Sequence, residues 1–168
     1  MKVSNRVVPA ALAAVLTAGS SIALLEKLEG NILHVYADPL ARGIPTYCAG
    51  KTDWKAPVGK TFTSDQCKEV NKTTLLEYGT AVLTCAKWDN LTPDRLLALT
   101  LFAINVGKAG ACNSQSMRQI NAGNISYGCK LISTKPDGSP NWSYSGGVYV
   151  QGLQNRRKIE AALCLKSS

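Results

Sequence analysis

The longest apolar stretch of the chain lies near its N-terminus, where residues 7–25 form nineteen positions without a charge. That length suffices for a helix to span a bilayer. Alanine, glycine, serine, threonine and proline outnumber the strongly apolar residues, so the segment is only weakly hydrophobic. The positive flank of Lys2 and Arg6 predicts an N-terminus in the cytoplasm and an exported remainder.

Three interpretations of this segment compete. A cleaved signal peptide would use the small residues Ala18-Gly19-Ser20 as its cleavage site. A buried core helix is seldom this long without a charge. The apolar run continues past that site over residues 22–25, which favours a retained signal anchor. We therefore divide the chain into a weak transmembrane signal-anchor segment, residues 1–25, and a globular domain, residues 26–168.

The remaining pattern predicts mostly helices and one hairpin. A helix over residues 21–29 ends at Gly30. Two strands follow, over residues 33–38 and 44–48, joined by a turn. The stretch 95–106 is nearly all apolar and is preceded by Thr92 and Pro93 as helix-starting residues, so it is predicted as the buried core helix. Further helices are predicted over residues 63–78, 114–121, 124–133 and 151–165. The fold class is therefore α+β.

Composition and charge narrow the class of protein. The 168 residues are 45% apolar, which excludes a disordered charged tail, and no long repeat indicates a solenoid. The net charge of +8 attracts the chain to polyanions, such as nucleic acid, anionic lipid or cell-wall polymer. Charge alone does not choose among these, and a basic surface without a specific anion is equally compatible with it.

The six cysteines all lie after residue 45. They form no C-x-x-C pair, and His34 is the single histidine, so we expect no metal site. An even number in an exported domain favours disulfides over free buried thiols, with fifteen possible connectivities. Two pairings are suggested by the predicted elements: Cys48 with Cys67 would brace the hairpin, and Cys129 with Cys164 would join two C-terminal helices.

Two carboxyl groups are candidates for chemistry. Glu29 lies in the last turn of a predicted helix, where the negative end of the helix dipole favours the protonated carboxyl that a general acid requires. Asp38 lies in a more solvated turn and is expected to stay ionised. Such a pair is typical of enzymes that cleave glycosidic bonds. By spacing alone, two ordinary surface charges are the better explanation of this pair.

The residues around these carboxyl groups resemble the catalytic segment of the phage T4-type lysozymes, glycoside hydrolase family 24. The likeness rests on residues 25–30 (LEKLEG), 35–38 (VYAD) and 43–46 (GIPT), and it continues in residues 103–107, 119–123 and 152–157. Together these segments cover about residues 22–165 in the family's order. The apolar N-terminus is similar to that of the signal-anchor-release endolysin branch.

The resemblance implies a fold and a reaction. It implies a lysozyme-like fold with a small N-terminal β-hairpin lobe and a helical C-terminal lobe around a central buried helix. In the family, the residue matching Glu29 protonates the leaving oxygen, the one matching Asp38 acts as base or electrostatic stabiliser, and the one matching Thr46 holds the attacking water. The implied substrate is peptidoglycan, cut at the β-1,4 bond between N-acetylmuramic acid and N-acetylglucosamine, without a cofactor and without a nucleic-acid partner.

Three further residues are expected to bind substrate. Asn105 lies where the family's core helix ends, Trp142 could stack on sugar, and Arg156 could contact anionic wall polymer. Core packing for Trp142 and an ion pair with Glu160 for Arg156 are the structural alternatives. The turn between Asp38 and Thr46 has seven residues, where the family commonly has five, so the position of Thr46 is less certain than that of Glu29.

Adjacency of the anchor and Glu29 predicts regulation. While residues 7–25 lie in the host inner membrane, Glu29 is held at the lipid surface and the site is inactive; release to the periplasm yields an active monomer that lyses the host cell and frees the phage. The alternative is an exported cationic module that binds wall or membrane without catalysis. Replacement of Glu29 by glutamine separates these two hypotheses, because only an enzyme would lose its activity.

Overall fold

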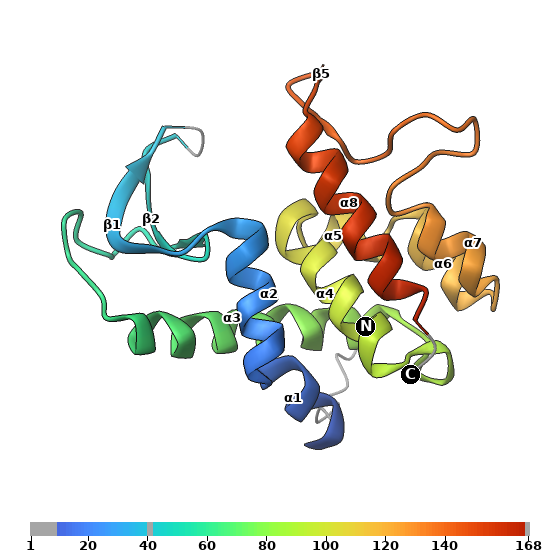
Figure 1. Cartoon of the computed structure of the whole chain (residues 1–168), viewed down its shortest axis with the longest axis horizontal. Helices are drawn as coiled ribbons and strands as arrows, with labels where there is room; N and C mark the ends of the chain where they lie inside the picture. The colour runs from blue at the N-terminus through green and yellow to red at the C-terminus, as the bar shows by residue number, and fades with distance from the viewer. Residues whose placement is uncertain (1–9, 40–41, 167–168) are drawn as a thin grey trace, which may run out of the picture. The chain divides into compact units, whose positions relative to one another are not determined.

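The computed structural model describes residues 10–39 and 42–166 (Figure 1). The chain forms two compact units: residues 16–76, and residues 10–15 together with 77–166. Lys2, Arg6 and the first residues of the predicted anchor lie outside the described residues, as do the two residues at the tip of the predicted hairpin. Each unit is described by itself below.

The unit of residues 16–76 contains the small sheet. Helix α2 (Gly19–Glu29) is followed by strands β1 (Ile32–Asp38), β2 (Ile44–Cys48) and β3 (Lys51–Thr52), and by the first part of α3 (Ser64–Cys85). The strands pair antiparallel in the order β1-β2-β3 (Figure 1). Helix α2 ends because Gly30 adopts a φ of 79°, which favours glycine, and its N–H donates to the Glu26 carbonyl at 2.9 Å. The predicted hairpin is thus confirmed, and β3 is an addition to it.

Strand β1 contains an irregularity that recruits a third segment. Its pairing with β2 shifts register between Ile32 and Tyr36. In this stretch the Val35 N–H donates to the Lys60 carbonyl at 2.8 Å, and the Phe62 N–H donates to the Leu33 carbonyl at 2.7 Å. The loop before α3 therefore covers β1, leaving less of its backbone open to other chains.

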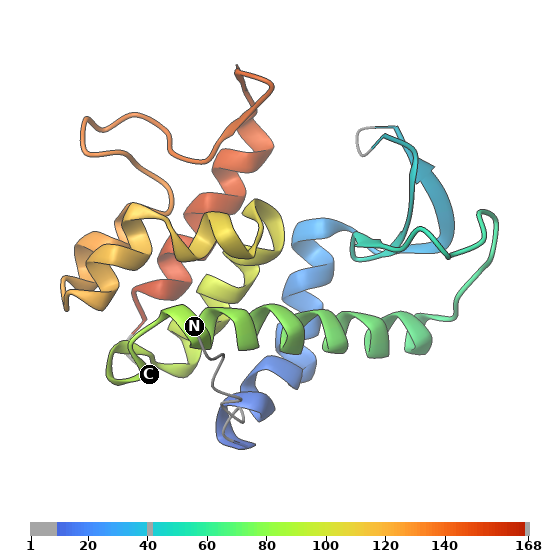
Figure 2. The same ribbon diagram turned by 180° about the vertical axis from the view of Figure 1, so that it is seen from behind.

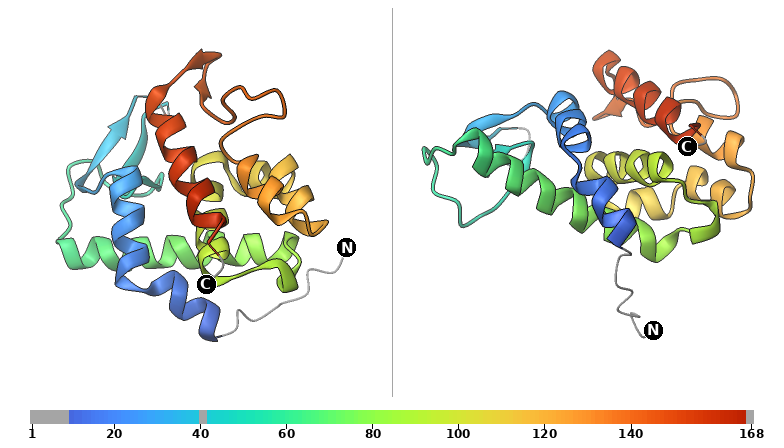
Figure 3. Two further views of the ribbon diagram at one scale, coloured as in Figure 1. Left: turned by 45° about the vertical axis from the view of Figure 1, so that its right-hand side comes forward. Right: turned by 60° about the horizontal axis from the view of Figure 1, so that its bottom comes forward.

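The second unit is built around a buried helix. In α4 (Pro93–Val106), nine consecutive residues from Arg95 to Ala103 are buried. Thr92 caps this helix by accepting a hydrogen bond from the Arg95 N–H at 3.2 Å, as predicted. Helix α8 (Gln151–Cys164) packs along α4 (Figure 3), and α6 (Gln115–Asn121) lies beside α7 (Ile125–Lys130), as Figure 2 shows from behind. The mostly helical α+β class is confirmed.

Several elements differ from the predicted ranges. Helix α3 runs seven residues beyond its predicted end, and α7 stops three residues before its predicted end. The short helices α5 (Lys108–Cys112) and η1 (Trp88–Asn90) were not predicted. Strands β4 (Tyr144–Ser145) and β5 (Val148–Tyr149) form a hairpin that was not predicted, and Gly146 and Gly147 form its turn with φ of 56° and 82°.

The N-terminal helices are short and bent against each other. Helix α1 (Ala10–Thr17) meets α2 at 48°. No single helix in residues 10–39 and 42–166 is long and apolar enough to cross a membrane, but α1 and α2 taken together reach the required length and composition. The predicted division of the chain at residue 25 falls inside α2. Leu16 and Leu25 are fully buried, and Ser21 is nearly so.

All six cysteines are paired. The disulfides are Cys48–Cys67, Cys85–Cys112 and Cys129–Cys164. The first and third are the pairings suggested by the predicted elements, and both are confirmed. Each disulfide lies within one of the two compact units. The covalent links therefore stabilise each unit internally.

Candidate active site

Glu29 is the last residue of α2, so its position is set by the point at which Gly30 ends the helix. Its carboxyl group lies beside the turn between β2 and β3, since a methyl group added to Gly50 would be 3.9 Å from Glu29 Oε2. Gly50 itself has a φ of +75°, which disfavours any side chain there. The turn thus approaches the Glu29 carboxyl group with bare backbone, and Oε1 of that group is buried.

Asp38 and Thr46 share one face of the sheet. Tyr36 is the cross-strand partner of Thr46, and Asp38 is the partner of Ile44. Directly opposed residues of an antiparallel pair point to the same face, and so do residues two apart on one strand. The register therefore brings together Asp38 and Thr46, despite the longer turn between them.

Tyr36 is a member of this face that the sequence did not indicate as functional. Burial raises the pKa of the Tyr36 phenol above its ordinary value, and the negative charge of Asp38 raises it further. The second effect requires the phenol and the carboxylate to be close in space. Strand periodicity was the available signal, because Tyr36 precedes Asp38 by two positions.

Thr46 is 3% exposed, and its hydroxyl donates to the Ile44 carbonyl at 3.0 Å. That bond uses the single hydroxyl proton, so the lone pairs of Oγ1 are the part of the group suited to a water molecule. Glu29, Asp38 and Thr46 all lie in the unit of residues 16–76. Their individual roles stay predictions at this point.

Asn71 on α3 supports the surroundings of Glu29. This side chain is 1% exposed. Its Oδ1 accepts from the Ala49 N–H at 3.2 Å, and its Nδ2 donates to Glu26 Oε1 at 3.0 Å. Glu26 lies one helical turn before Glu29. Ala49 precedes Gly50, the glycine that lies beside the Glu29 carboxyl group. One amide therefore fixes both the helix that carries Glu29 and the turn beside it.

The same turn is held by a covalent link. Cys48 precedes Ala49 and is bonded to Cys67, which lies one helical turn before Asn71 on α3. Disulfide and amide thus attach neighbouring residues of the turn to one face of the helix. Nothing in the sequence around Asn71 distinguished it from a surface residue of a polar helix.

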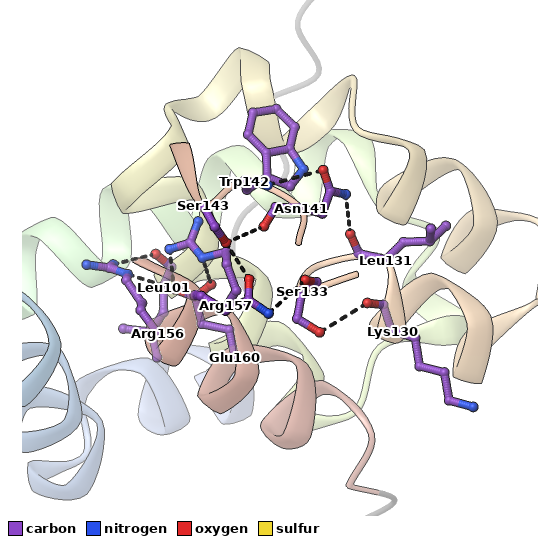
Figure 4. Close-up of polar contacts among 11 residues, drawn as sticks. Leu101, Lys130, Leu131, Ser133, Asn141, Trp142, Ser143, Arg156, Arg157 and Glu160 are labelled. Atoms are coloured by element: carbon purple, nitrogen blue, oxygen red, sulfur yellow. Dashed lines mark hydrogen bonds and ion pairs between the residues drawn. The ribbon is translucent and has the colours of Figure 1, made fainter. Parts of the chain in front are cut away.

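Asn105 and Trp142 come together in the other unit. They line a cavity of about 360 Å³ whose remaining lining residues are Val106, Tyr144, Ser145 and Leu153. The Trp142 N–H donates to Asn141 Oδ1 at 3.1 Å (Figure 4). Trp142 has a φ of 53°, and its ring meets that of Phe102 edge-on at a centroid distance of 5.5 Å. A volume of this size is in the range of small-molecule sites.

Arg156 lies elsewhere. It is 6% exposed; its Nε donates to Glu160 Oε1 at 2.9 Å and its Nη2 to the Leu101 carbonyl at 3.0 Å (Figure 4). The ion pair with Glu160, the structural alternative, is therefore present. A guanidinium buried on these partners is not offered to a polymer at the surface, so we do not keep Arg156 among the substrate-binding residues.

The described part of the chain contains no cluster of side chains suited to bind a metal ion. Among residues 10–39 and 42–166, no three His, Cys, Asp or Glu side chains are grouped as metal ligands. His34 lies on β1 with its ring 6.3 Å from that of Tyr36.

Comparison with known proteins places the chain in a family. Residues 26–160 match the phage lysozyme family. The chain is 33% identical over 156 residues to the SAR-endolysin of Enterobacteria phage PA-2, covering 92% of this chain and 87% of that protein. It is 32% identical over 138 residues to the SAR-endolysin of Bacteriophage PS119, covering 82% and 77%.

Solved structures agree in fold. The muramidase domain of SpmX from Asticaccaulis excentricus has a TM-score of 0.76 at 22% identity, covering 89% of this chain and 97% of that domain. A mutant of P22 lysozyme has a TM-score of 0.68 at 27% identity, with the same coverage. The predicted lysozyme-like fold is confirmed. The chain therefore belongs to the phage lysozyme family, and it is an endolysin, a lysozyme-type glycosidase that degrades peptidoglycan.

Proposed function

We propose that this endolysin hydrolyses the β-1,4 bond between N-acetylmuramic acid and N-acetylglucosamine, with Glu29 as general acid, Asp38 as base or electrostatic stabiliser, and Thr46 as the residue that holds the attacking water. One observation carries the proposal: the sheet register puts Asp38 and Thr46 on one face, in the same compact unit as Glu29. A proton donor and an ionised partner are what glycosidic cleavage requires.

The reaction follows from these groups. The Glu29 carboxyl gives its proton to the glycosidic oxygen as the bond from C1 to that oxygen breaks, and the departing sugar leaves as an alcohol. Water attacks C1 from the opposite face, its oxygen becomes the new C1 hydroxyl, and its proton passes to Asp38. A direct attack by water inverts the configuration at C1.

Tyr36 contributes a neutral phenol to this face. A tyrosine is neutral near pH 7, and burial and the charge of Asp38 raise the pKa of Tyr36 above its ordinary value. The neutral phenol adds no second negative charge beside Asp38. The Asp38 carboxylate on this face therefore stabilises the positive charge that develops at C1.

Asn105 and Trp142 bind the glycan strand in this proposal. The indole of Trp142 is 37% exposed at the wall of the 360 Å³ cavity, and the amide of Asn105 lies at the end of α4. Aromatic faces stack on the apolar faces of sugar rings, and amides pair with acetamido and hydroxyl groups.

We also propose that residues 7–25 anchor the chain in the host inner membrane, with a cytoplasmic N-terminus and a periplasmic catalytic domain, until release to the periplasm as a monomer. The SAR-endolysin relatives and the composition of the α1 and α2 pair support this. Leu16 and Leu25 are fully buried in the folded chain, so the segment cannot lie in a bilayer and in this fold at once. The fold described here is then the released form.

Product analysis tests the proposed bond. Purified sacculi are digested in ¹⁸O-labelled water and the fragments are examined by mass spectrometry and NMR. We expect reducing N-acetylmuramic acid ends that carry one ¹⁸O at C1 and form first as the α-anomer. Reducing N-acetylglucosamine ends, 1,6-anhydro ends or cleaved peptide bonds would each contradict the proposal.

A further inference from the structure

Among the described residues of the unit 16–76, the most exposed large apolar side chains lie in the loop between β3 and α3 (Figure 1). Trp54 is 71% exposed and Val58 is 62% exposed, compared with 38% for Ile32 and 39% for Leu33 on β1. A lone exposed apolar residue is ordinary in a protein surface. Two of them within five positions form an apolar patch that the fold itself does not bury.

Both side chains lie at the tips of tight turns. A turn over residues 53–56 is closed by a backbone hydrogen bond of 3.0 Å and has Trp54 and Lys55 at its centre. A second turn, over residues 57–60, is closed by a backbone hydrogen bond of 3.1 Å and has Val58 near its tip. The tips of turns normally carry glycine, proline or small polar residues. Tryptophan and valine at these tips therefore need a reason other than turn formation.

The loop is attached to the sheet at both ends. The Asp53 N–H donates to the Pro45 carbonyl on β2 at 3.0 Å, and the Gly59 N–H donates to the Val35 carbonyl on β1 at 2.9 Å. Within the loop, Asp53 Oδ1 accepts from the Lys55 N–H at 2.9 Å. The apolar tips are thus presented by ordered backbone, so little conformational entropy is lost when they bind a partner.

Lysines flank the apolar tips. Residues 51–60 contain three lysines and one aspartate, a local charge of +2. Lys55 directly follows Trp54 and is exposed; Lys60 is also exposed, and its ammonium is 5.1 Å from the centroid of the Phe62 ring. The carboxylates that follow on α3 are paired with lysines of the same helix, Asp65 with Lys68 and Glu69 with Lys72. The loop therefore presents positive charge beside its apolar side chains.

This combination of groups fits the surface of an anionic bilayer. An indole places its apolar body among the lipid headgroups while its N–H stays hydrated. Lysine stems lie along apolar surface while their ammonium groups reach phosphates, and each lysine near an anionic membrane strengthens binding about fivefold. A glycan or small molecule would instead require a concave site with convergent polar groups, whereas Trp54 and Val58 lie at exposed turn tips.

We propose that residues 51–60 form a membrane-surface site of the folded chain. Trp54 and Val58 insert at the headgroup level of an anionic phospholipid bilayer, and Lys55 and Lys60 bind its phosphates. The site is separate from residues 7–25, so the folded enzyme keeps contact with the membrane surface without an inserted helix. Such contact holds the enzyme between the bilayer and the cell wall.

Binding of the full chain to lipid vesicles tests the site. Phosphatidylcholine vesicles, with or without about one third phosphatidylglycerol, are floated with the wild type, Trp54→Ser, Val58→Ser and Lys55→Ser. The matched controls are Val148→Ser and Lys130→Ser, because Val148 is 68% exposed and Lys130 is an exposed lysine, both outside the loop. Residues 7–25 are present in every protein, so differences between variants report the loop. Equal thermal melting excludes misfolding as their cause.

The expected result is a loss of binding confined to the loop variants. We expect Trp54→Ser to lower the partition coefficient on anionic vesicles about tenfold, which corresponds to ~1.4 kcal/mol, and Val58→Ser to lower it about threefold. Lys55→Ser should lower it about fivefold at low salt and have little effect at about 0.5 M salt, where surface charges are screened. The control variants should stay within about twofold of the wild type.

Indole fluorescence locates Trp54 directly. Brominated lipids quench an indole that lies in the bilayer interface, and Trp54→Phe supplies the background of the other tryptophans. We expect quenching in the wild type that Trp54→Phe lacks. Equal quenching in the two proteins, or equal binding by all variants, would overturn the loop site and leave membrane contact to residues 7–25. Loop variants that lose binding to purified sacculi but not to vesicles would assign the loop to the cell wall and refute the proposal.

Discussion

At the scale of single residues, side chains along β1 alternate between the two faces of the sheet, and this alternation determines which residues lie beside Asp38. Tyr36 and Asp38 are two positions apart, so their side chains share a face, and the raised pKa of Tyr36 reports both its burial and the carboxylate beside it. A folded-state pKa above the unfolded value means that neutral Tyr36 stabilises the fold below about pH 10, and that this contribution is lost as the pH rises through the folded value.

Removing the charge at Asp38 should therefore change the titration of Tyr36. We expect Asp38→Asn to lower the pKa of Tyr36, because the coulombic part of the shift disappears while the burial part remains. The measurement is tyrosinate absorbance between pH 9 and about pH 12, taken as the difference from matched Tyr36→Phe proteins so that the other tyrosines cancel. Identical Tyr36 curves with and without the Asp38 charge would show that the two groups are not close.

The sequence indicated Glu29 and Asp38 through family resemblance, but it gave no sign of Asn71. The role of Asn71 depends on contacts with Glu26 and Ala49, which lie 45 and 22 residues away along the chain. Such contacts have no local pattern, because they arise only when the helix and the turn are packed together. Long-range positioning groups are for this reason the part of the site that sequence periodicity cannot reveal.

Asn71→Leu should impair both stability and turnover. Loss of the amide leaves the buried Ala49 N–H without its acceptor, which is expected to cost about 1–3 kcal/mol of unfolding free energy. We also expect kcat per folded molecule to fall more than KM rises, since the turn beside Glu29 is released. Urea unfolding and steady-state kinetics measure these, with Thr73→Ala on the exposed side of α3 as control. An unchanged kcat per folded molecule would restrict Asn71 to a purely structural role.

At the scale of elements, the predicted ranges are accurate where the apolar pattern is long and capped. The core helix predicted over residues 95–106, with Thr92 and Pro93 as its starting residues, is observed as α4. The length of α3 was underestimated, because a helix commonly ends near a glycine and Gly79 follows the predicted end. In the structure Gly79 is buried within α3, and the helix continues beyond it. Strands of two residues, as in β4 and β5, are too short to show an alternating pattern.

Helix α8 was predicted within one residue of its range, and the ion pair of Arg156 with Glu160 that was given as the structural alternative is present, but the burial of its charged side chains was not predicted. Arg157 and Glu160 are fully buried, with Arg157 Nε 2.9 Å from Glu160 Oε2 and its guanidinium 5.1 Å from the Phe102 ring centroid. Spacings of three and four residues let Glu160 pair with both Arg156 and Arg157. A helix as apolar as α4 needs cover on every side, and these paired charges supply part of it.

Glu160→Gln should be strongly destabilising. The change removes the buried negative charge with which both Arg156 and Arg157 pair, and breaking a buried ion pair typically costs about 3–5 kcal/mol. Glu77→Gln is the control, because the Lys108–Glu77 pair is 42–43% exposed and is expected to contribute less than about 1 kcal/mol. Urea unfolding of both variants measures the difference. Equal losses in the two variants would show that burial of the ion pairs on α8 has no energetic consequence.

At the scale of the whole chain, the cysteine count and the apolar N-terminus predicted an exported, disulfide-bonded protein, and the three pairs are present. Cys85–Cys112 was not among the suggested pairings, because α5, which carries Cys112, is too short to be predicted. The anchor prediction and the fold make competing demands on the same residues. Leu16 and Leu25 are buried in the fold, yet both belong to the segment proposed to lie in the membrane.

The balance between the membrane-inserted and the folded state can be shifted toward the membrane by more apolar side chains at exposed positions of this segment. Gly19 and Ser20 are exposed in the folded chain, so leucines there should leave the fold intact while favouring the bilayer. We expect the double variant Gly19→Leu/Ser20→Leu to remain in the membrane fraction and to delay lysis, and Gly19→Ala/Ser20→Ala to lie between it and the wild type. Cell fractionation and culture turbidity measure both effects. An unchanged distribution between fractions would contradict release as the activating step.

The central claim is that the Glu29 carboxyl donates the proton that breaks the glycosidic bond. The most direct measurement is the rate of reducing-end release from purified sacculi by Glu29→Gln, compared with Glu69→Gln, an exposed glutamate of the same unit paired to Lys72. The account predicts that Glu29→Gln loses at least about 10²-fold in kcat at unchanged melting temperature, while Glu69→Gln keeps wild-type activity. A Glu29→Gln protein that hydrolyses sacculi at the wild-type rate would contradict it.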